Sequence, residues 1–335
     1  MSGAKRVLVT GADGFLGRGL IEALNNAGTF DAIVAADVRS VPADRRLQHV
    51  HYQTLDVRDQ GLAKVLTTHE IDTVVHLASI VTPGKDSNRE FEYSVDVLGT
   101  RNVLDACVQA GVQQIVISSS GAAYGYYPDN PEWIVESDAI RGNEAFAYSH
   151  HKRLVEEMLA DYRQHSPQLS QTILRIGTIL GEKVDNQITA LFEKPRLLAI
   201  RGSESPFVFI WDTDVTGAIL HALHTRQAGC FNLAGDGALP LREIAARLGK
   251  PLLTLPAGLL KAALKIAHAL GLSRYGPEQL DFLRYRPVLL NTALKKKLGY
   301  TPAKTSSDAL NDFIAARAAQ GKPVTAKKVT HRRPA

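Results

Sequence analysis

The stretch KRVLVTGADGFLG (5–17) decides the fold. Its β-branched, apolar beginning predicts a buried strand, and the pattern after the glycines predicts a helix that runs to about residue 26. Gly11 permits the tight turn between them, Gly14 lets the backbone approach a pyrophosphate, and Gly17 lets helix and strand pack closely. Because the start of a helix favours negative charge, this loop is predicted to bind the phosphates of a dinucleotide.

Apolar runs alternate with helical patterns through the first half of the chain. Fully apolar strands separated by helices are typical of a parallel sheet that is covered on both faces, and such a sheet binds ligands at the carboxyl ends of its strands. The fold class is therefore predicted to be a doubly wound α/β sheet. Further strands are expected at 32–37, 51–56, 72–78, 112–120 and 171–176, and helices at 61–68, 88–110 and 145–165.

The regular alternation ends after residue 178, which predicts a division of the chain. Residues 1–178 are expected to form the dinucleotide-binding domain, to which a helix and a strand within about 207–236 return. Residues 179–320 are expected to form a smaller, mostly helical lobe that binds the substrate. The basic end of the chain, 321–335, is predicted to be disordered.

The composition excludes several classes of protein. With 45% hydrophobic and 22% charged residues, the chain is typical of a globular protein and unlike a disordered one. The net charge of +5 resides in residues 322–335, which carry five basic and no acidic residues, so no nucleic-acid-binding face is expected. No apolar run is long enough for a membrane span or a secretory leader. Cys107 and Cys230 lack the spacing of a disulfide framework or a metal site, so no metal is expected and a cytoplasmic location is predicted.

Asp37 ends the second predicted strand, 20 residues after Gly17. A carboxylate at this place binds the 2′-hydroxyl of an adenosine ribose and repels a 2′-phosphate. NAD is therefore the predicted cofactor. NADP stays a weaker alternative, because Arg39 lies close enough in the sequence to accommodate a phosphate.

Tyr148 and Lys152 lie four residues apart on the predicted helix 145–165 and so share one face of it. A free tyrosine is a poor base because its pKa is about 10, but a neighbouring cation favours the phenolate. Ser120, at the carboxyl end of the strand 112–120, can form a hydrogen bond to the same reacting oxygen. Together with a nucleotide loop, these three residues predict an acid–base site for hydride transfer.

A series of motifs resembles those of the extended short-chain dehydrogenases/reductases, the NAD-dependent epimerase/dehydratase superfamily. The resemblance covers about residues 5–235, and LGYTP (298–302) is similar to the end of the family's substrate lobe. The matching motifs are GADGFLG (11–17), Asp37, LDVRD (55–59), HLAS (76–79), VLGTRNVLDA (97–106), SSSGAAYG (118–125), YSHHK (148–152), LRIGTILG (174–181) and FVFIWDTDVTGAI (207–219).

The resemblance implies a Rossmann fold and a role for each matching residue. Tyr148 is implied as the general acid/base, Lys152 as the ligand of the nicotinamide ribose, and Ser120 as the residue that orients the substrate oxygen. Substrate contacts are implied for Ser79, Ser120, Tyr148 and Thr178. The residues implied to contact the cofactor are Gly11, Gly14, Phe15, Leu16, Gly17, Asp37, Asp56, Val57, Leu77, Ala78, Ser79, Ser118, Tyr148, Lys152 and Ile176.

The chain departs from the pattern of the nucleotide-sugar members of this family at several positions. Thr178 stands where they usually have asparagine, and Phe207 stands where they often have an arginine for the diphosphate. Asp96 stands where asparagine is common. Arg286 with Pro287 partly resembles a second phosphate-binding motif, and the arginines that can compensate are Arg201, Arg284 and Arg286.

These departures favour hydride transfer between NAD(H) and a secondary alcohol or ketone of an apolar or small substrate. The alternative is a nucleotide-sugar epimerase or dehydratase, similar to UDP-glucose 4-epimerase, with tightly bound NAD. A third hypothesis is a cofactor-sensing regulator on the same fold, but such proteins commonly lose the tyrosine or lysine that this chain retains. The resemblance also implies a homodimer formed through the helices 88–110 and 145–165.

From 237 to about 316 the pattern is helical, without strands. Its most apolar segment, PAGLLKAALKIAHALGL (256–272), is open to three interpretations: a lid over an apolar pocket, part of the lobe core, or a helix on a membrane surface. Among the histidines, His76 is expected to pack within a buried strand. His150 and His151 are expected to face solvent or a partner subunit, away from Tyr148.

Overall fold

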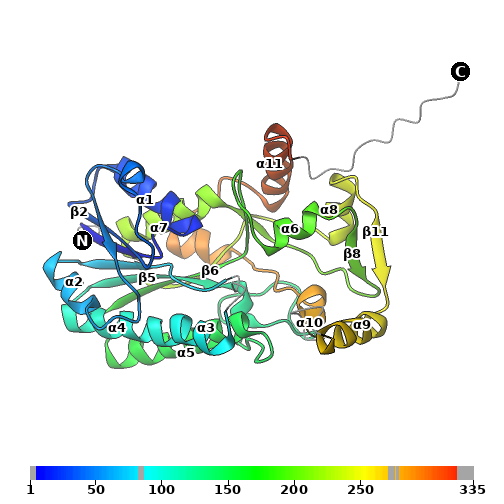
Figure 1. Cartoon of the computed structure of the whole chain (residues 1–335), viewed down its shortest axis with the longest axis horizontal. Coiled ribbons are helices and arrows are strands. Elements are labelled where there is room, and N and C mark those ends of the chain that lie inside the picture. The colour runs from blue at the N-terminus through cyan, green and yellow to red at the C-terminus, as the bar shows by residue number, and fades with distance from the viewer. Residues whose placement is uncertain (1–4, 82–86, 271–275, 277–278, 323–335) are drawn as a thin grey trace, which may run out of the picture.

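The computed structural model describes residues 5–81, 87–270, 276 and 279–322. Within these residues, seven parallel strands form one sheet in the order β10–β6–β5–β4–β1–β2–β3 (Figure 1). The predicted doubly wound sheet is therefore confirmed. The strands are β1 (Arg6–Thr10), β2 (Ala32–Asp37), β3 (Val50–Thr54), β4 (Thr73–His76), β5 (Gln114–Ser120), β6 (Ser170–Ile176) and β10 (Gly229–Leu233).

Helices cover both faces of this sheet, which explains why its strands are almost entirely apolar. Leu8 of β1 packs with the helices of one face, whereas Val7 and Val9 pack with those of the other, and all three are fully buried. One face is covered by α1 (Phe15–Ala27) and α7 (Asp212–Thr225), and the other by α2 (Leu62–Thr68), α4 (Gly99–Ala110) and α5 (Ala147–His165) (Figure 1).

The strand order reverses between β1 and β4. From β1 the chain builds β2 and β3 on one side and then returns to build β4, β5 and β6 on the other. At such a reversal the connections after the strands diverge and leave a crevice at the carboxyl ends, where ligands of this kind of sheet bind.

The single helix predicted at 88–110 is interrupted. The structure has α3 (Arg89–Tyr93), a π-helical turn η2 (Ser94–Leu98) and then α4. A π-turn inserts one residue into the helix and so changes which side chains face the core. Asp96 lies inside this turn and is only 4% exposed, and a regular helical pattern did not indicate that it would be buried.

The C-terminal part is mostly helical, as predicted, but it also contains two small sheets. In these, β7 (Thr178–Leu180) pairs with β9 (Phe209–Trp211), and β8 (Leu197–Ile200) pairs with β11 (Leu252–Leu255). The expectation of no strand after residue 237 was therefore wrong, because a run of four residues is too short to show a strand period. The helices are α6 (Gln187–Glu193), α8 (Leu241–Arg247), α9 (Ala257–Ala269), α10 (Gln279–Arg284) and α11 (Ser306–Ala319). The proposed domain division at residue 178 stays a prediction.

Helix α9 lies at the end of this lobe farthest from the large sheet (Figure 1). Leu259 and Ile266 are each 61% exposed, and none of the described side chains of α9 is buried. The interpretation of 256–272 as lobe core was therefore wrong. No described helix combines the length and the hydropathy needed to cross a membrane. Of the predicted tail, 321–335, the residues from 323 onward lie outside the part of the chain that the structure describes.

Candidate active site

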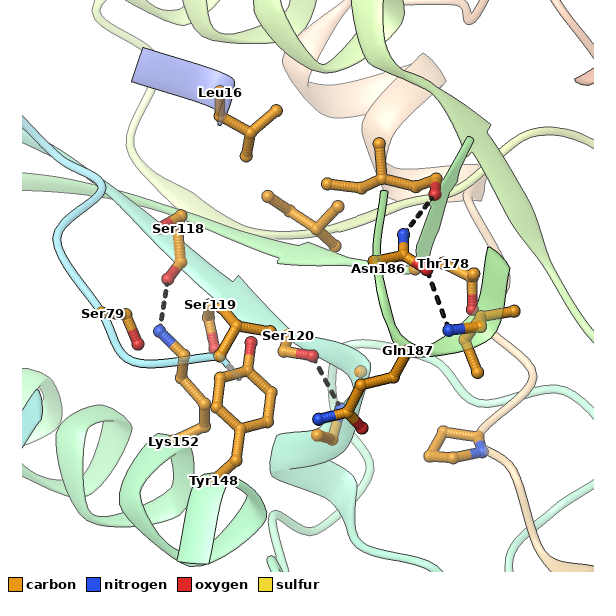
Figure 2. Close-up of a pocket in the computed structure, with 18 of the residues that line it drawn as sticks. Leu16, Ser79, Ser118, Ser119, Ser120, Tyr148, Lys152, Thr178, Asn186 and Gln187 are labelled. Atoms are coloured by element: carbon orange, nitrogen blue, oxygen red, sulfur yellow. Dashed lines mark hydrogen bonds between the residues drawn. The ribbon is translucent and has the colours of Figure 1, made fainter. Parts of the chain in front are cut away.

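A cavity of about 420 Å³ opens at the carboxyl ends of β1, β4, β5 and β6 (Figure 2). It brings together most of the residues that the sequence singled out. These lining residues are Gly11, Gly14, Phe15, Leu16, Gly17, Leu77, Ser79, Ser118, Ser120, Tyr148, Lys152, Ile176 and Thr178. The predicted cofactor residues outside this lining are Asp37, Asp56, Val57 and Ala78.

The glycine loop between β1 and α1 forms one wall of the cavity. Gly11 has φ of 67°, and a Cβ there would lie 2.8 Å from the backbone nitrogen of Ala78. A Cβ on Gly17 would lie 2.2 Å from the carbonyl oxygen of Gly11. Gly14 precedes α1 without a side chain to cap it, so the first N–H groups of this helix stay available for an anion.

Helix α5 carries Tyr148 and Lys152 on the face that borders the cavity. The first turn of α5 is fixed by Ser149, whose buried hydroxyl donates a hydrogen bond to the carbonyl oxygen of Ala122 at 2.6 Å. The Lys152 side chain is only 7% exposed, and its Nζ donates to the carbonyl oxygen of Ser118 at 2.9 Å. The same Nζ lies 5.6 Å from the centroid of the Tyr148 ring, so the phenol and the ammonium face one space.

Three consecutive serines at the end of β5 have different surroundings. The hydroxyl of Ser118 donates to the carbonyl oxygen of His76 at 3.2 Å. Ser119 faces the opposite side of the sheet and donates to Glu156 at 2.5 Å. The Ser120 hydroxyl accepts a hydrogen bond from the backbone N–H of Ala122 at 3.1 Å and lines the cavity, as Figure 2 shows.

A buried ion pair supports the site from behind. Arg175 of β6 donates to both carboxylate oxygens of Glu156 on α5, and the shortest of these bonds is 2.7 Å. Arg175 also donates to the hydroxyl of Tyr124 at 2.7 Å, and burial raises the pKa of this tyrosine. Because the pair joins α5 to β6, it holds the helix that carries Tyr148 against the sheet.

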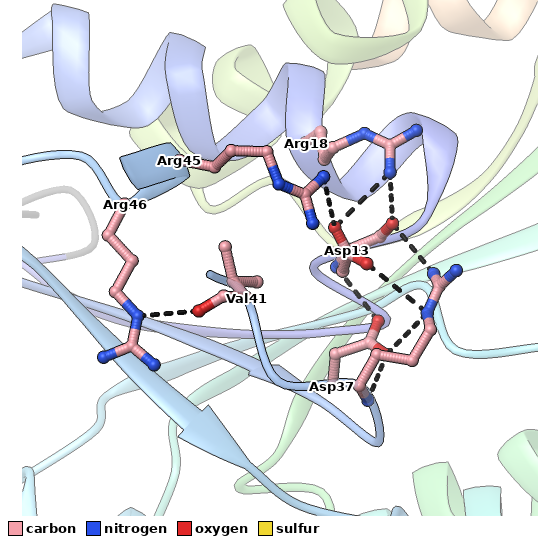
Figure 3. A network of polar contacts seen from close by, with 7 residues as sticks. Asp13, Arg18, Asp37, Val41, Arg45 and Arg46 are labelled. Carbon is pink, nitrogen blue, oxygen red and sulfur yellow. Dashed lines mark hydrogen bonds and ion pairs between the residues drawn. The ribbon is translucent and has the colours of Figure 1, made fainter. Parts of the chain in front are cut away.

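Asp37 lies at the end of β2, within a cluster of arginines (Figure 3). Its Oδ2 accepts from the backbone N–H of Asp13 at 2.9 Å, and its Oδ1 accepts from the backbone N–H of Arg39 at 3.0 Å. Asp13 in turn has three guanidinium groups within 4 Å of its carboxylate, those of Arg18, Arg39 and Arg45. Arg39 was identified from the sequence as a residue that can accommodate a phosphate, but no sequence pattern indicated Arg18 or Arg45, which belong to separate elements.

The remaining predicted cofactor residues lie beside the loop or beyond β3. Ala78 donates its backbone N–H to the hydroxyl of Thr10 at 3.3 Å. Val57 is buried, and Asp56 forms an ion pair with Arg58 at 2.6 Å. The guanidinium of Arg58 holds the pKa of Asp56 below its usual range.

The wall opposite the glycine loop is aromatic and was largely missed by the sequence analysis. The ring of Phe282 lies 5.1 Å from that of Tyr126 and 5.7 Å from that of Phe146, between centroids. Phe146 in turn lies 6.4 Å from Tyr148. These residues come from loops and from α10, and no local pattern indicates that they meet.

Arg286 lies in the same wall. Its guanidinium is 3.9 Å from the centroid of Phe207 and 5.3 Å from that of Phe282. It donates to the hydroxyl of Ser205 at 2.5 Å, and no carboxylate lies within 4 Å among the described residues. Burial lowers the pKa of Arg286 to about 10. Of the arginines expected to compensate for the missing phosphate ligand, Arg286 lines the cavity, whereas Arg201 and Arg284 do not.

The prediction for His151 was wrong. This side chain is 1% exposed, and its Nδ1 lies 3.0 Å from a carboxylate oxygen of Asp96. The other oxygen of Asp96 accepts from the Ser79 hydroxyl at 3.1 Å and from the backbone N–H of Ile80 at 2.8 Å. The π-turn that buries Asp96 thus ties α5 to the loop after β4, which forms part of the cavity wall.

His76, by contrast, packs between the hydroxyls of Thr10 and Thr100. No group of three or more His, Cys, Asp or Glu among the described residues is arranged to hold a metal ion.

A family model and several known proteins match the sequence of this chain. The model of the NAD dependent epimerase/dehydratase family matches residues 7–234. An uncharacterised protein of Mycobacterium tuberculosis is 27% identical over 316 residues, which cover 93% of this chain and 84% of that protein. The UDP-glucose 4-epimerase of Yersinia pestis is 33% identical over 185 residues, which cover 52% of this chain and 53% of the epimerase.

Solved structures share the fold. A UDP-glucose 4-epimerase of Thermotoga maritima, crystallised with UDP-glucose, has a TM-score of 0.72 at 18% identity and covers 94% of this chain and 99% of its own. A dTDP-glucose 4,6-dehydratase of Bacillus anthracis, in complex with NAD, has a TM-score of 0.73 at 17% identity. The similarity covers 95% of this chain and 98% of the dehydratase chain. At these identities the similarity is one of fold alone.

Proposed function

Because the chain belongs to the NAD-dependent epimerase/dehydratase family, a family of enzymes, we propose that it catalyses hydride transfer between NAD(H) and a secondary alcohol or ketone. The observation that carries this proposal is that Tyr148, Lys152 and Ser120 border the same cavity as the glycine loop. An acid–base group and a dinucleotide loop are the two parts that such a reaction needs in one place.

The residues around the loop fit a dinucleotide. The pyrophosphate binds at the loop from Gly11 to Gly17, where a side chain at either end would collide with backbone. Asp37, at the end of β2, binds the adenosine ribose. Lys152 binds the nicotinamide ribose, and Leu16, Leu77 and Ile176 line the path between the two ends.

Hydride exchange with the substrate carbon is the chemistry that the nicotinamide supplies when it is bound. Tyr148 takes the proton of the substrate hydroxyl during oxidation and returns it during reduction. Lys152, held by the Ser118 carbonyl, keeps a positive charge beside the phenol and so stabilises the phenolate. The Ser120 hydroxyl donates a hydrogen bond to the substrate oxygen, while its own oxygen accepts one from the backbone N–H of Ala122.

The cavity wall supports a small, largely apolar substrate that carries one negative charge. Phe146, Phe207 and Phe282 supply apolar surface, and among the described residues the charged ones that line the cavity, other than Lys152, are Asp185 and Arg286. Within this described lining a diphosphate would meet one arginine and one carboxylate, too little to replace its hydration. A single anionic group on an apolar body fits this wall better.

A nucleotide-sugar epimerase or dehydratase is the second candidate. It is favoured by the 33% identity to a UDP-glucose 4-epimerase over about half of the chain. It is disfavoured by the loss of one cation at Phe207, because Arg286, stacked on this ring at 3.9 Å, is the arginine that the described lining residues offer to a diphosphate. Epimerisation would use the same Tyr148 and Lys152, but it would produce no net NADH.

A homodimer through α4 and α5 belongs to this proposal. The two helices pack against each other on one face of the sheet, and Leu98, which directly precedes α4, is 46% exposed. Light scattering during size-exclusion chromatography measures the mass, and a mass of about 36.4 kDa, that of one chain, would contradict the dimer.

A substrate panel tests the proposed reaction. Steroid-like, aliphatic and aryl secondary alcohols, each as a neutral compound and as a carboxylate, are incubated with NAD beside UDP-glucose and dTDP-glucose. We expect NADH formation, followed by its absorbance, with the apolar carboxylates. Conversion of only the sugar nucleotides, found by product analysis without net NADH, would favour the second candidate.

A further inference from the structure

We propose that helix α9 lays its exposed apolar face on a membrane surface that contains anionic phospholipids. The helix lies in the plane of that surface, with apolar side chains among the acyl chains and lysines at the headgroups. This interaction goes beyond the proposed function and does not depend on it, because it concerns the end of the C-terminal lobe rather than the cavity.

The three most exposed large apolar side chains among the described residues lie on α9 or directly after it. Leu259 and Ile266 are each 61% exposed, and Leu270 is 66% exposed. Leu270 continues the helical turn, since its backbone N–H donates to the carbonyl oxygen of Ile266 at 3.0 Å. Spacings of seven and four residues place all three on one face of the helix. Single exposed apolar residues are common on protein surfaces, but a row of them marks an interaction surface.

The other two sides of α9 differ from this apolar face. Leu260, Leu264 and Ala267 are half-buried, and α9 packs against α10. Lys261 and Lys265, one helical turn apart, are exposed, and their ammonium groups form no ion pair with any described residue. An apolar face beside a lysine face, on a helix whose third side is held by the protein, is the pattern of an interfacial helix.

The charges around α9 favour anionic lipids as the partner. In the sequence, residues 244–277 contain five lysines and arginines and no aspartate or glutamate. Lys250 is buried and Arg247 is paired within α8, so Lys261 and Lys265 are the exposed cations of α9. The aliphatic part of a lysine can lie along apolar surface while its ammonium group stays in water, where it attracts the anionic headgroups of a membrane.

Two other occupants of the apolar face fit less well. A second copy related by a two-fold axis would bring the lysines of both helices together, with no acidic residue of the same segment to pair with them. A lid over the active-site cavity would supply lining residues, but none of the described residues of α9 lines that cavity. Because α9 lies at the end of the lobe farthest from the large sheet, the sheet does not stand between this face and a bilayer (Figure 1).

Co-sedimentation of the full chain with large unilamellar vesicles tests this surface. The vesicles are phosphatidylcholine alone or an equal mixture of phosphatidylcholine and phosphatidylglycerol, at low ionic strength. Each lysine near an anionic surface strengthens binding by about fivefold, so the mixture should bind at least about tenfold more tightly than phosphatidylcholine alone. Added salt should weaken the binding, because it screens the charges.

Substitutions on the two faces of α9 separate their contributions. Leu259→Ser and Ile266→Ser should each weaken binding to the mixed vesicles by about tenfold, because each removes apolar surface that the lipid would cover. Lys261→Gln and Lys265→Gln should each weaken it by about fivefold. All four side chains are exposed, so the Tm of each variant should stay within about 2 °C of the original value.

Matched controls make the same changes on other surfaces. Val38→Ser changes an apolar side chain of nearly the same exposure, 60%. Lys296→Gln combined with Lys297→Gln removes two exposed lysines from the π-helical turn η4 (Leu294–Leu298). Both controls should bind the mixed vesicles within about twofold of the unchanged protein. In Leu259→Trp, the tryptophan emission should shift to the blue when mixed vesicles are added, because the ring enters the lipid.

Two results would overturn the proposal. One is no tighter binding of the unchanged protein to the mixed vesicles than to phosphatidylcholine alone, which would leave the apolar face to a protein partner. The other is full binding by Leu259→Ser and Ile266→Ser, the result expected if the basic residues of 322–335 attach the chain by charge alone. Neither result concerns cofactor or substrate, so failure of this proposal is distinguishable from failure of the proposed function.

Discussion

Lys152 donates a hydrogen bond from Nζ to the carbonyl oxygen of Ser118, 2.9 Å away, and so joins helix α5 to the end of strand β5. Ser120 follows two residues later on the same strand, and Tyr148 precedes Lys152 by about one helical turn. Together with the hydrogen bond from Ser119 to Glu156, this contact holds the strand that carries the serine against the helix that carries the tyrosine.

Tyr148→Phe removes the hydroxyl that exchanges a proton with the substrate and leaves the ring in place. Loss of general acid–base catalysis should lower kcat by about 10²–10⁴-fold. NADH affinity, measured by fluorescence, should stay within about threefold of the original value, because the glycine loop and Asp37 are unchanged. Retained turnover would remove this tyrosine from the mechanism.

Asp37→Ser tests the assignment of the adenosine ribose. The substitution removes an anion that favours a ribose hydroxyl and repels a 2′-phosphate. The ratio of NADH affinity to NADPH affinity should fall by about tenfold, as measured by paired titrations. An unchanged ratio would refute the assignment.

Arg286→Met tests the anionic group of the substrate. Removal of a charge-assisted contact should raise the KM of a carboxylate substrate by about 10–100-fold. The KM of the neutral counterpart should stay within about threefold of its original value. Arg284→Met is the control, since Arg284 carries the same charge two residues away and does not line the cavity. Because burial lowers the pKa of Arg286 to about 10, binding of the anion should also weaken as the pH rises through 10. Equal effects on charged and neutral substrates would contradict the role.

His76 predicts how stability depends on pH. Burial lowers the pKa of this histidine to about 3, whereas an unfolded histidine has a pKa of about 6.5. Below pH 6.5 the unfolded chain binds a proton that the folded chain does not, so the free energy of unfolding should fall with decreasing pH, by up to about 1.4 kcal/mol per unit. In urea unfolding, the free energy of unfolding of His76→Gln should fall less steeply between about pH 6 and 4. The control variant is His165→Gln, at the exposed end of α5, and it should keep the original slope. Identical slopes in all three proteins would exclude His76 as the cause.

Local patterns in the sequence were sufficient for the sheet and for the glycine loop. A buried strand, a glycine at positive φ and a helix start are determined by neighbouring residues, so Gly11 and Gly17 could be interpreted without a structure. The placement of Tyr148 beside Lys152 was predictable for the same reason, because residues four positions apart on a helix share a face.

Features that depend on tertiary packing were missed. The π-turn at Ser94–Leu98 shifts Asp96 toward the core, and so the prediction that His151 faces solvent or a partner failed. Phe282 reaches the cavity from more than 100 residues beyond Tyr148, and no local period predicts that meeting. Helix α9 is apolar in sequence yet exposed, because nothing in its own pattern specifies whether another element covers it.

A crystal structure of the protein grown with NADH tests the central claim most directly. The account predicts the pyrophosphate at the loop from Gly11 to Gly17, the adenosine ribose at Asp37, and the nicotinamide ring in contact with the hydroxyl of Tyr148. A dinucleotide whose nicotinamide lies away from Tyr148, or a glycine loop that binds none, would contradict it.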